Sequence, residues 1–233
     1  MKEAIKEALF EMFALEEEAA RTQEERGRSD KGNRSGVTSG KHLDPLASAI
    51  ANELLTYGVS ERELFVGNSP KEMTLPGYYR PTKKWDILAF RGGNLMTAIE
   101  LKSISSSYGN NFNNRAEEAV GSGEDAKQTI RNNLLGGGCL PTFCYALVVR
   151  YDDSLRRLEN YYEPYFKVDP EFKNADYVKK TTTMCLRLLS EKLYDAVWLV
   201  FVNLKNHEIY EPSEAISYDK FIKRIKGQID LFD

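Results

Sequence analysis

Apolar residues along this chain recur either with a helical period or in the runs and alternations typical of strands. Residues 2 to about 24 carry the helical pattern, and residues 44–57 repeat it after a polar gap. Two apolar runs, 142–151 and 196–202, are typical of strands. The first of them is predicted to be a buried strand. Further strands are predicted over 85–90 and 95–102, and a short apolar piece lies at 64–66. Further helices are predicted from residue 113 or 114 to Gly121–Gly123, over 125–135, over 176–193 and over 218–231.

Helices and strands therefore mix along the chain, with no internal repeat, low-complexity segment or domain-separating linker. This order predicts one α/β domain over residues 1–233. An N-terminal helix and a basic loop (1–43) precede the core (about 44–233). The first helix directs one side inward, made of Ile5, Leu9, Met12, Phe13 and Ala20.

The strands predicted over 85–90 and 95–102 flank a Gly92–Gly93 turn and form a hairpin. Because side chains on a strand alternate between its faces, Glu100 and Lys102 lie on one face. That face also carries Met96 and Ala98. A three-residue loop, Gly92 to Asn94, pairs Phe90 with Met96, Leu88 with Ala98 and Asp86 with Glu100.

This register places two carboxylates, Asp86 and Glu100, opposite each other. Like charges across a strand pair are destabilising, and a divalent cation with oxygen ligands compensates them. Lys102 lies two residues beyond Glu100, within reach of whatever the cation binds. The alternative reading, a solvated strand end with Glu100 and Lys102 as an exposed pair, stays open.

Composition excludes several classes of protein. Hydrophobic residues make up 42% and charged residues 29%, as in ordinary soluble domains, and no apolar run is long enough to span a membrane. The N-terminus has the pattern of an acidic amphipathic helix, not of a signal peptide. Three cysteines and two histidines show no zinc-type spacing, and the odd cysteine count suits a reducing compartment. We expect a cytoplasmic protein without a membrane partner.

The net charge of −3 argues against a generic nucleic-acid binder, but local charge is different. Residues 21–41 contain six basic and three acidic side chains. Arg80, Lys83 and Lys84 precede Asp86 with no acid among them. A basic rim around an acidic centre suits a metal-dependent phosphodiesterase, whereas two solvated charge runs remain the alternative.

The helix over 44–57 carries one more acid of interest. Asp44 is its predicted N-cap with Pro45 at the first helical position, and Gly58 ends it. Glu53 lies on or beside the core-facing stripe of this helix, formed by Leu46, Ile50 and Leu54. Glu53 is either a further metal ligand or an edge residue that reaches water.

Several segments together resemble the XhoI-type family of type II restriction endonucleases, within the PD-(D/E)xK nuclease superfamily. The resemblance covers about Gly32 to Val197, with departures at 123–127 and in the N-terminal helix. The segments are NRSGVTSGKHLD, GYYRPTKKWDILAF, AIELKS, YGNNFNNRAEEAVGS, YYEPYFKVDPEFKNADYVKK and LRLLSEKLYDAV.

The resemblance implies a restriction-endonuclease-like core, in which helices flank a central mixed β-sheet. It also implies a Mg²⁺-dependent homodimer that cuts double-stranded DNA at a palindrome, CTCGAG in the family, and an associated DNA methyltransferase. Asp86, Glu100 and Lys102 would be the catalytic residues. Asp86, Glu100 and the Leu101 carbonyl would hold the metal, and Lys102 would orient or deprotonate the attacking water, leaving a 5′-phosphate and a 3′-hydroxyl.

Recognition of DNA requires side chains that read base edges. Asn pairs bidentately with adenine and Arg with guanine, so the run after the catalytic strand is a candidate reader: Asn110, Asn111, Asn113, Asn114 and Arg115. Turn-forming asparagines and a helix cap at Asn113 or Asn114 are the alternative. Asn33, Arg34 and Lys83 are further candidate DNA contacts.

Other functions remain open at this point. The chain could be a sequence-specific DNA-binding protein without catalysis, or a PD-(D/E)xK nuclease of DNA repair. A hydrolase of small phosphoesters fits less well, since the chain lacks a nucleotide-binding Gly-rich loop. The pattern also leaves open whether Glu53, Glu117 or Glu118 joins the site.

Overall fold

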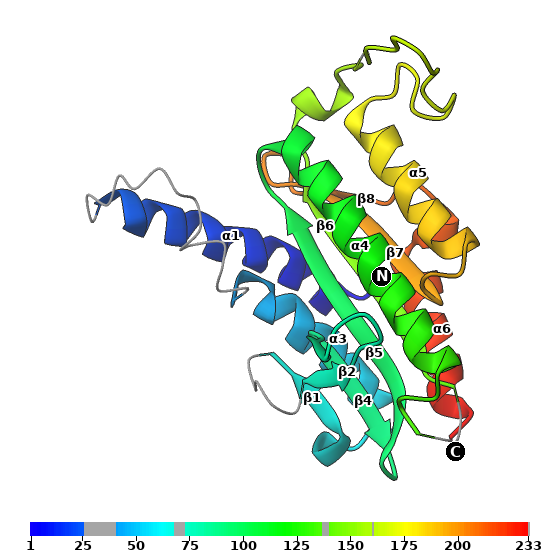
Figure 1. Cartoon of the computed structure of the whole chain (residues 1–233). Helices are drawn as coiled ribbons and strands as arrows, with labels where there is room; N and C mark the ends of the chain where they lie inside the picture. The colour runs from blue at the N-terminus through cyan, green and yellow to red at the C-terminus, as the bar shows by residue number, and fades with distance from the viewer. Residues whose placement is uncertain (26–40, 68–72, 137–139, 160, 233) are drawn as a thin grey trace.

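The computed structural model describes residues 1–25, 41–67, 73–136, 140–159 and 161–232 (Figure 1). Its centre is a six-stranded sheet in the order β1-β4-β5-β6-β7-β8. The β5–β6 and β6–β7 pairs are parallel and the others antiparallel, so the sheet is mixed. The strands are β1 (Leu64–Val66), β4 (Ile87–Arg91), β5 (Asn94–Ile104), β6 (Thr142–Arg150), β7 (Ala196–Asn203) and β8 (Glu208–Tyr210).

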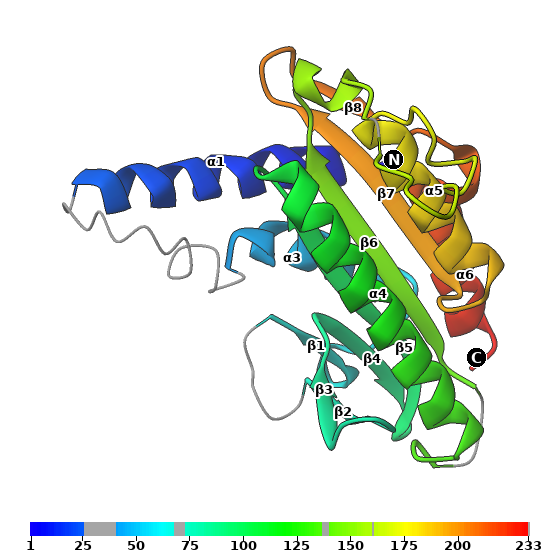
Figure 2. The same cartoon turned by 45° about the horizontal axis from the view of Figure 1, so that its top comes forward.

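Within the described residues, five α-helices cover the two faces of this sheet. One buried cluster packs α1, α3 and α6 against one face, and a second packs α4 and α5 against the other. Both views show α4 and α5 side by side along the sheet (Figures 1 and 2). The helices are α1 (Glu3–Glu25), α3 (Asp44–Thr56), α4 (Tyr108–Arg131), α5 (Tyr177–Ser190) and α6 (Tyr218–Asp230).

The connections follow from the strand order. Parallel strands require crossovers, and α4 supplies the one from β5 to β6, whereas α5 supplies the one from β6 to β7. β6 and β7 are buried on both sides, as their nearly continuous apolar sequences predict. The predicted α/β architecture, a central mixed sheet flanked by helices, is confirmed. Short 3₁₀ helices lie at Lys41–Leu43, Glu61–Glu63, Asp153–Arg156 and Glu214–Ile216.

A second, two-stranded sheet was not predicted. β2 (Thr74–Pro76) and β3 (Thr82–Lys84) form an antiparallel hairpin beside the main sheet. Figure 2 shows it near β4, β5 and the C-terminal half of α4.

The β4–β5 register differs in part from the predicted one. Leu88 pairs with Ala98 as expected, but Phe90 pairs with Leu95, not with Met96. A two-residue turn at Gly92–Gly93, both with positive φ, replaces the predicted three-residue loop. A bulge absorbs the extra residue, so Met96 lies in the cluster opposite to that of Ala98.

Two helix starts were predicted wrongly. α4 is one helix from Tyr108, whereas a start at residue 113 or 114 and a break at Gly121–Gly123 were expected. Gly123 stays helical because it packs against the 193–194 segment: a Cβ there would lie 3.0 Å from the Leu193 Cβ. In α3, Leu43 is the N-cap and Asp44 the first helical residue.

The buried part of the apolar side of α1 extends over fewer residues than predicted. Ile5, Leu9, Met12 and Phe13 are buried, but Ala20 is exposed, because α1 extends beyond the sheet that it covers (Figure 1). None of the helices in the described part of the chain combines the length and hydropathy that crossing a membrane requires.

Candidate active site

Asp86 lies directly before β4, where the β4–β5 ladder ends. Its backbone N–H donates to the Ile99 carbonyl (3.1 Å), which holds it beside β5. Its carboxylate accepts a hydrogen bond from the Leu101 N–H (2.7 Å). The structure thus brings Asp86 next to Glu100, on the sheet face covered by α4 and α5.

Glu100 is buried, and each of its oxygens contacts an ammonium group. Lys102, two residues along β5, lies 2.5 Å from Oε1. Lys83, from β3, donates to Oε2 at 2.7 Å. Lys83 is itself shielded: its side chain is 9% exposed and its Nζ lies 4.5 Å from the centre of the Trp85 ring. Two carboxylates and two cations therefore form one compact cluster.

Burial and charge set the protonation of this cluster. Burial raises the pKa of Asp86 to about 6, and the neighbouring Glu100 carboxylate adds to the rise. Burial alone would also raise the pKa of Glu100, but Lys83 and Lys102 outweigh it and hold that pKa below its usual value. Burial opposes the charge of Lys102 too, yet Glu100 keeps the Lys102 pKa raised. Asp86 is the member of the cluster whose charge is least compensated.

The donors at this point are hard oxygens, which suit Mg²⁺. Residues two apart on a strand direct their carbonyls to the same side. Because the Ile99 carbonyl faces Asp86, the Leu101 carbonyl faces the same end of the hairpin. Within the described residues no group of three or more His, Cys, Asp or Glu is arranged to hold a metal. A cation here would complete its shell with water and substrate oxygens, as Mg²⁺ commonly does.

The four asparagines after β5 lie in the first two turns of α4. The Asn111 side chain donates to the Ser106 carbonyl (2.6 Å) and so supports the helix start. Asn110, Asn113 and Asn114 are exposed and, at spacings of three and four, share one side of the helix. Since α4 begins at Tyr108, neither Asn113 nor Asn114 is its cap.

The other predicted DNA contacts are placed differently. Arg115 is mostly buried, with Nη1 2.5 Å from Glu118, and its Nε has no hydrogen-bond partner among the described residues. Lys83 was expected on a basic rim around the site. Its side chain instead points inward and contacts Glu100. Asn33 and Arg34 lie outside the described residues.

The sequence left open whether Glu53, Glu117 or Glu118 joins the site, and the structure shows where each of them lies. Glu53 lies in α3, against the opposite face of the sheet, where it accepts hydrogen bonds from Tyr57 and Tyr218 (2.8 Å for Tyr218) and contacts Lys2. It is therefore neither a ligand at the Asp86–Glu100 site nor an edge residue. Glu117 and Glu118 are both exposed, but Glu118 pairs with Arg115 and its charge adds to the raised pKa of Lys102.

Sequence reasoning missed the contact between Lys83 and Glu100. Strand alternation relates residues of one hairpin, but Lys83 comes from the separate β2–β3 hairpin, whose three-residue strands carry no recognisable period. The signal present was Lys83 itself, three residues before Asp86 and two before the apolar Trp85.

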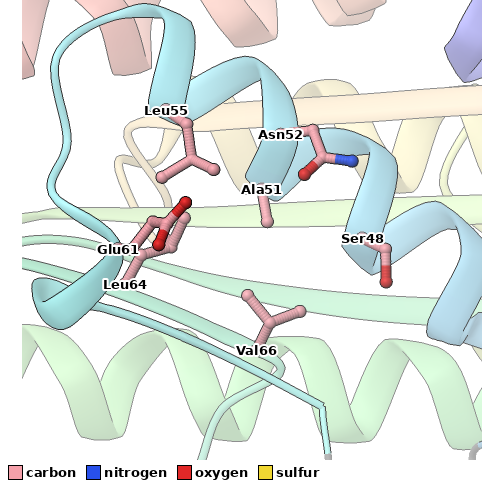
Figure 3. A pocket seen from close by; sticks show the side chains of 7 residues that line it. All are labelled: Ser48, Ala51, Asn52, Leu55, Glu61, Leu64 and Val66. Carbon is pink, nitrogen blue, oxygen red and sulfur yellow. The ribbon is translucent and has the colours of Figure 1, made fainter.

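A cleft of about 240 Å³ lies elsewhere, between α3 and β1 (Figure 3). Apolar side chains and the carboxylate of Glu61 line it, together with Ser48 and Asn52. None of Asp86, Glu100 and Lys102 reaches it, so the cleft is separate from the candidate active site.

A family model described as restriction endonuclease XhoI matches residues 22–212 of this chain. The type II restriction enzyme XhoI of Xanthomonas vasicola is 40% identical over 70% of this chain and 65% of that relative. BstVI of Geobacillus stearothermophilus is 37% identical over 73% of this chain and 78% of its own length. AbrI of Azospirillum brasilense is 32% identical over 62% of this chain and 64% of its own length. The match thus spans slightly less than two thirds of the XhoI and AbrI relatives, and no solved structure matches the chain.

Proposed function

This chain belongs to the restriction endonuclease XhoI family, and we propose that it is a Mg²⁺-dependent type II restriction endonuclease acting on double-stranded DNA. The observation that carries the proposal is the convergence of Asp86, Glu100 and Lys102 at the open end of one hairpin. The mixed sheet, with its catalytic hairpin followed by a helical crossover to a parallel strand, is consistent with a restriction-endonuclease-like core.

Asp86, Glu100 and the Leu101 carbonyl would hold Mg²⁺ at this site. Bound Mg²⁺ supplies polarisation of the scissile phosphate and lowers the pKa of a coordinated water. Both oxygens of Glu100 contact lysines. Glu100 can therefore bind a metal only if the ammonium group of Lys83 or Lys102 moves away from it. Because its pKa is raised to about 6, Asp86 is ionised and available as a ligand mainly above that pH.

Lys102 is placed for two roles. Its ammonium group, which contacts Glu100, would lie beside the attacking water. From there it orients the water and offsets the negative charge that develops on the phosphate. In-line attack by the water would leave a 5′-phosphate and a 3′-hydroxyl.

The finer features of the reaction follow from the same family. We propose a short palindrome as the recognition site, CTCGAG or a related sequence, read in part by Asn110, Asn113 and Asn114 from the exposed side of α4. Cutting both strands of a palindrome requires two active sites related by a twofold axis, hence a homodimer. A DNA methyltransferase of the same specificity would protect the host.

The direct test is to incubate the protein with long DNA and Mg²⁺ and to sequence the ends of the products. We expect uniform ends at one palindrome. Specific binding without any cleavage would favour a DNA-binding protein, and ends at random positions or only at junctions would favour a repair nuclease.

Single substitutions test the assigned residues. Asp86→Ala, Glu100→Ala and Lys102→Ala should each reduce cleavage below detection, with circular dichroism unchanged. Removal of one such group commonly costs about two or more orders of magnitude in rate. Near-wild-type cleavage by any one variant in excess Mg²⁺ would remove that residue from the mechanism.

A further inference from the structure

The β2–β3 hairpin ends in an exposed aromatic turn, residues Gly77 to Pro81, here called the hairpin tip. Tyr78 is 48% exposed and Tyr79 66% exposed. Their rings touch edge to face, with centroids 5.0 Å apart. Exposed aromatic surface of this kind is commonly functional on a soluble protein.

A buried acid holds the hairpin tip in place. Asp125 of α4 is 2% exposed, and its Oδ1 accepts hydrogen bonds from the Tyr78 N–H (2.9 Å) and the Tyr79 N–H (2.8 Å). Its Oδ2 accepts from Arg80 Nε at 2.8 Å. Burial of a carboxylate is unfavourable unless it is fully bonded, and here every described bond of Asp125's carboxylate goes to the tip. Two exposed rings are thus presented in a fixed position.

The turn also depends on a glycine. A Cβ on Gly77 would lie 2.6 Å from the Arg80 carbonyl oxygen and 2.9 Å from Asp125 Oδ2. The chain therefore closes on Asp125 only with glycine at this position.

The base of the hairpin joins the candidate active site. Lys83, three residues after Arg80, contacts Glu100 at 2.7 Å. Leu75 and Trp85 are buried in the same cluster as Leu88 and Ala98 of the catalytic hairpin. The tip is therefore fixed relative to Asp86 and Glu100 from two sides, through α4 and through β3.

From this geometry we infer that the hairpin tip is a DNA-binding element that contacts the duplex beside the scissile phosphate. The inference rests on the proposed function and adds a contact that the asparagines of α4 do not supply. Of the three basic side chains in residues 74–85, Lys83 is turned inward onto Glu100. Lys84 is exposed, and Arg80, bonded through Nε to Asp125, is 42% exposed, so these two present positive charge that complements the phosphate backbone. Tyrosine hydroxyls bind phosphates, and the rings pack against sugars and base steps.

The test uses the full chain and a short labelled duplex carrying the sequence that the wild-type protein cuts, with Ca²⁺ in place of Mg²⁺. The variant is Tyr78→Ala with Tyr79→Ala. The matched control is Tyr162→Ala with Tyr165→Ala, two tyrosines that are each 90% exposed in the segment before α5. We expect the tip variant to bind the duplex roughly tenfold or more weakly and the control to bind within about twofold of wild type, as loss of aromatic contacts to DNA implies.

Hydroxyl-radical footprinting separates a direct contact from a general weakening. The tip variant should lose protection at a few consecutive sugars next to the cut and keep the rest of the footprint. Unfolding midpoints of both variants should match that of the wild type, since all four side chains are exposed.

Three results would overturn the inference. Equal affinity and an unchanged footprint would exclude the tip from the DNA interface while leaving the proposed function intact. A change from dimer to monomer in sedimentation would assign the tip to contact with a second copy of the chain. Absence of both binding and cleavage by the wild-type protein would remove the proposed function and the inference together.

Discussion

Glu100 is the residue that connects the charged groups of the candidate site. Its two oxygens are shared between Lys102 of its own strand and Lys83 of a different hairpin. These cations keep Glu100 ionised although it is buried, while Asp86 receives far less compensation and its pKa rises to about 6. A metal at this site would therefore stabilise Asp86 most, because its charge is the one that the protein leaves unbalanced.

Asp86→Asn should stabilise the metal-free protein, and the effect should depend on pH. The folded-state pKa of Asp86 is about 6 against 3.8 for the unfolded chain, so the folded protein binds this proton more tightly. Asp86 thus costs stability above about pH 6, by up to about 3 kcal/mol, and the cost disappears as pH falls towards 4. Denaturant unfolding with EDTA at pH 8 and pH 4 measures it.

Glu53→Gln is the matched control on the other face of the sheet. Burial alone would raise the pKa of Glu53, but the hydrogen bonds from Tyr57 and Tyr218 and the Lys2 charge lower it, so its ionised form stabilises the fold. Substitution should destabilise the protein at pH 8 and less so below the pKa of Glu53. If Asp86→Asn and Glu53→Gln changed stability in the same direction at pH 8, the assigned electrostatics of Asp86 would be wrong.

Lys83→Met should tighten metal binding in the absence of DNA. Lys83 holds Oε2 of Glu100, and a metal at Glu100 competes with that contact. We expect Mn²⁺ affinity, measured by calorimetry on the DNA-free protein, to increase severalfold. Lys84→Met, an exposed neighbour in the same strand, should leave the affinity unchanged. Weaker Mn²⁺ binding by Lys83→Met would mean that Lys83 positions Glu100 rather than competing for it.

At the scale of elements, α4 connects β5, the strand that carries Glu100 and Lys102, to the rest of the molecule. It crosses from β5 to β6, carries the exposed asparagines near its start and holds the hairpin tip through Asp125 near its end. Its central turns pack closely on the segment after α5, where the Tyr194 hydroxyl donates to the Ala119 carbonyl at 3.0 Å. The position of α4 thus sets the spacing between both proposed DNA contacts.

Two glycines of α4 give a matched test of that packing. A Cβ at Gly123 would lie 3.0 Å from both Leu193 Cβ and Tyr194 Cε2, whereas Gly121 faces open space. Gly123→Ala should destabilise the protein by about 1–3 kcal/mol through overpacking. Gly121→Ala should be neutral or stabilise it by up to about 1 kcal/mol, since alanine is the better helix former. Thermal unfolding compares them, and equal effects would contradict the packing described.

The sequence predicted most of the molecule where the hydrophobic signal is long. β6, β7, α5 and α6 were predicted to within a few residues, because their apolar positions repeat over several turns or fill a whole strand. The start of α4 was missed because Gly109 and the asparagines favour turns locally. Packing of Tyr108 and Phe112 against Tyr177 overrides that preference.

In the candidate site, too, contacts within one hairpin were predicted from the sequence, whereas contacts between separate elements were not. The structure brings Asp86, Glu100 and Lys102 together, as strand alternation over a few residues predicts, although a two-residue turn and a bulge replace the predicted loop. Lys83 and Asp125 reach their partners across separate elements, 17 and about 45 residues away in sequence. Local periodicity carries no information on such contacts.

The whole molecule, finally, contains one Asp86–Glu100–Lys102 cluster, whereas a double-strand cut at a palindrome needs two. The proposed homodimer predicts that a mixed dimer, wild type paired with Lys102→Ala, cuts one strand per site. Each protomer carries a different tag, the two are co-expressed, and sequential affinity steps isolate the pair. On a plasmid with a single site we expect open circles to accumulate, while the wild-type dimer makes linear DNA. Failure to recover any mixed pair, or direct linearisation by it, would contradict a dimer in which each active site serves one strand.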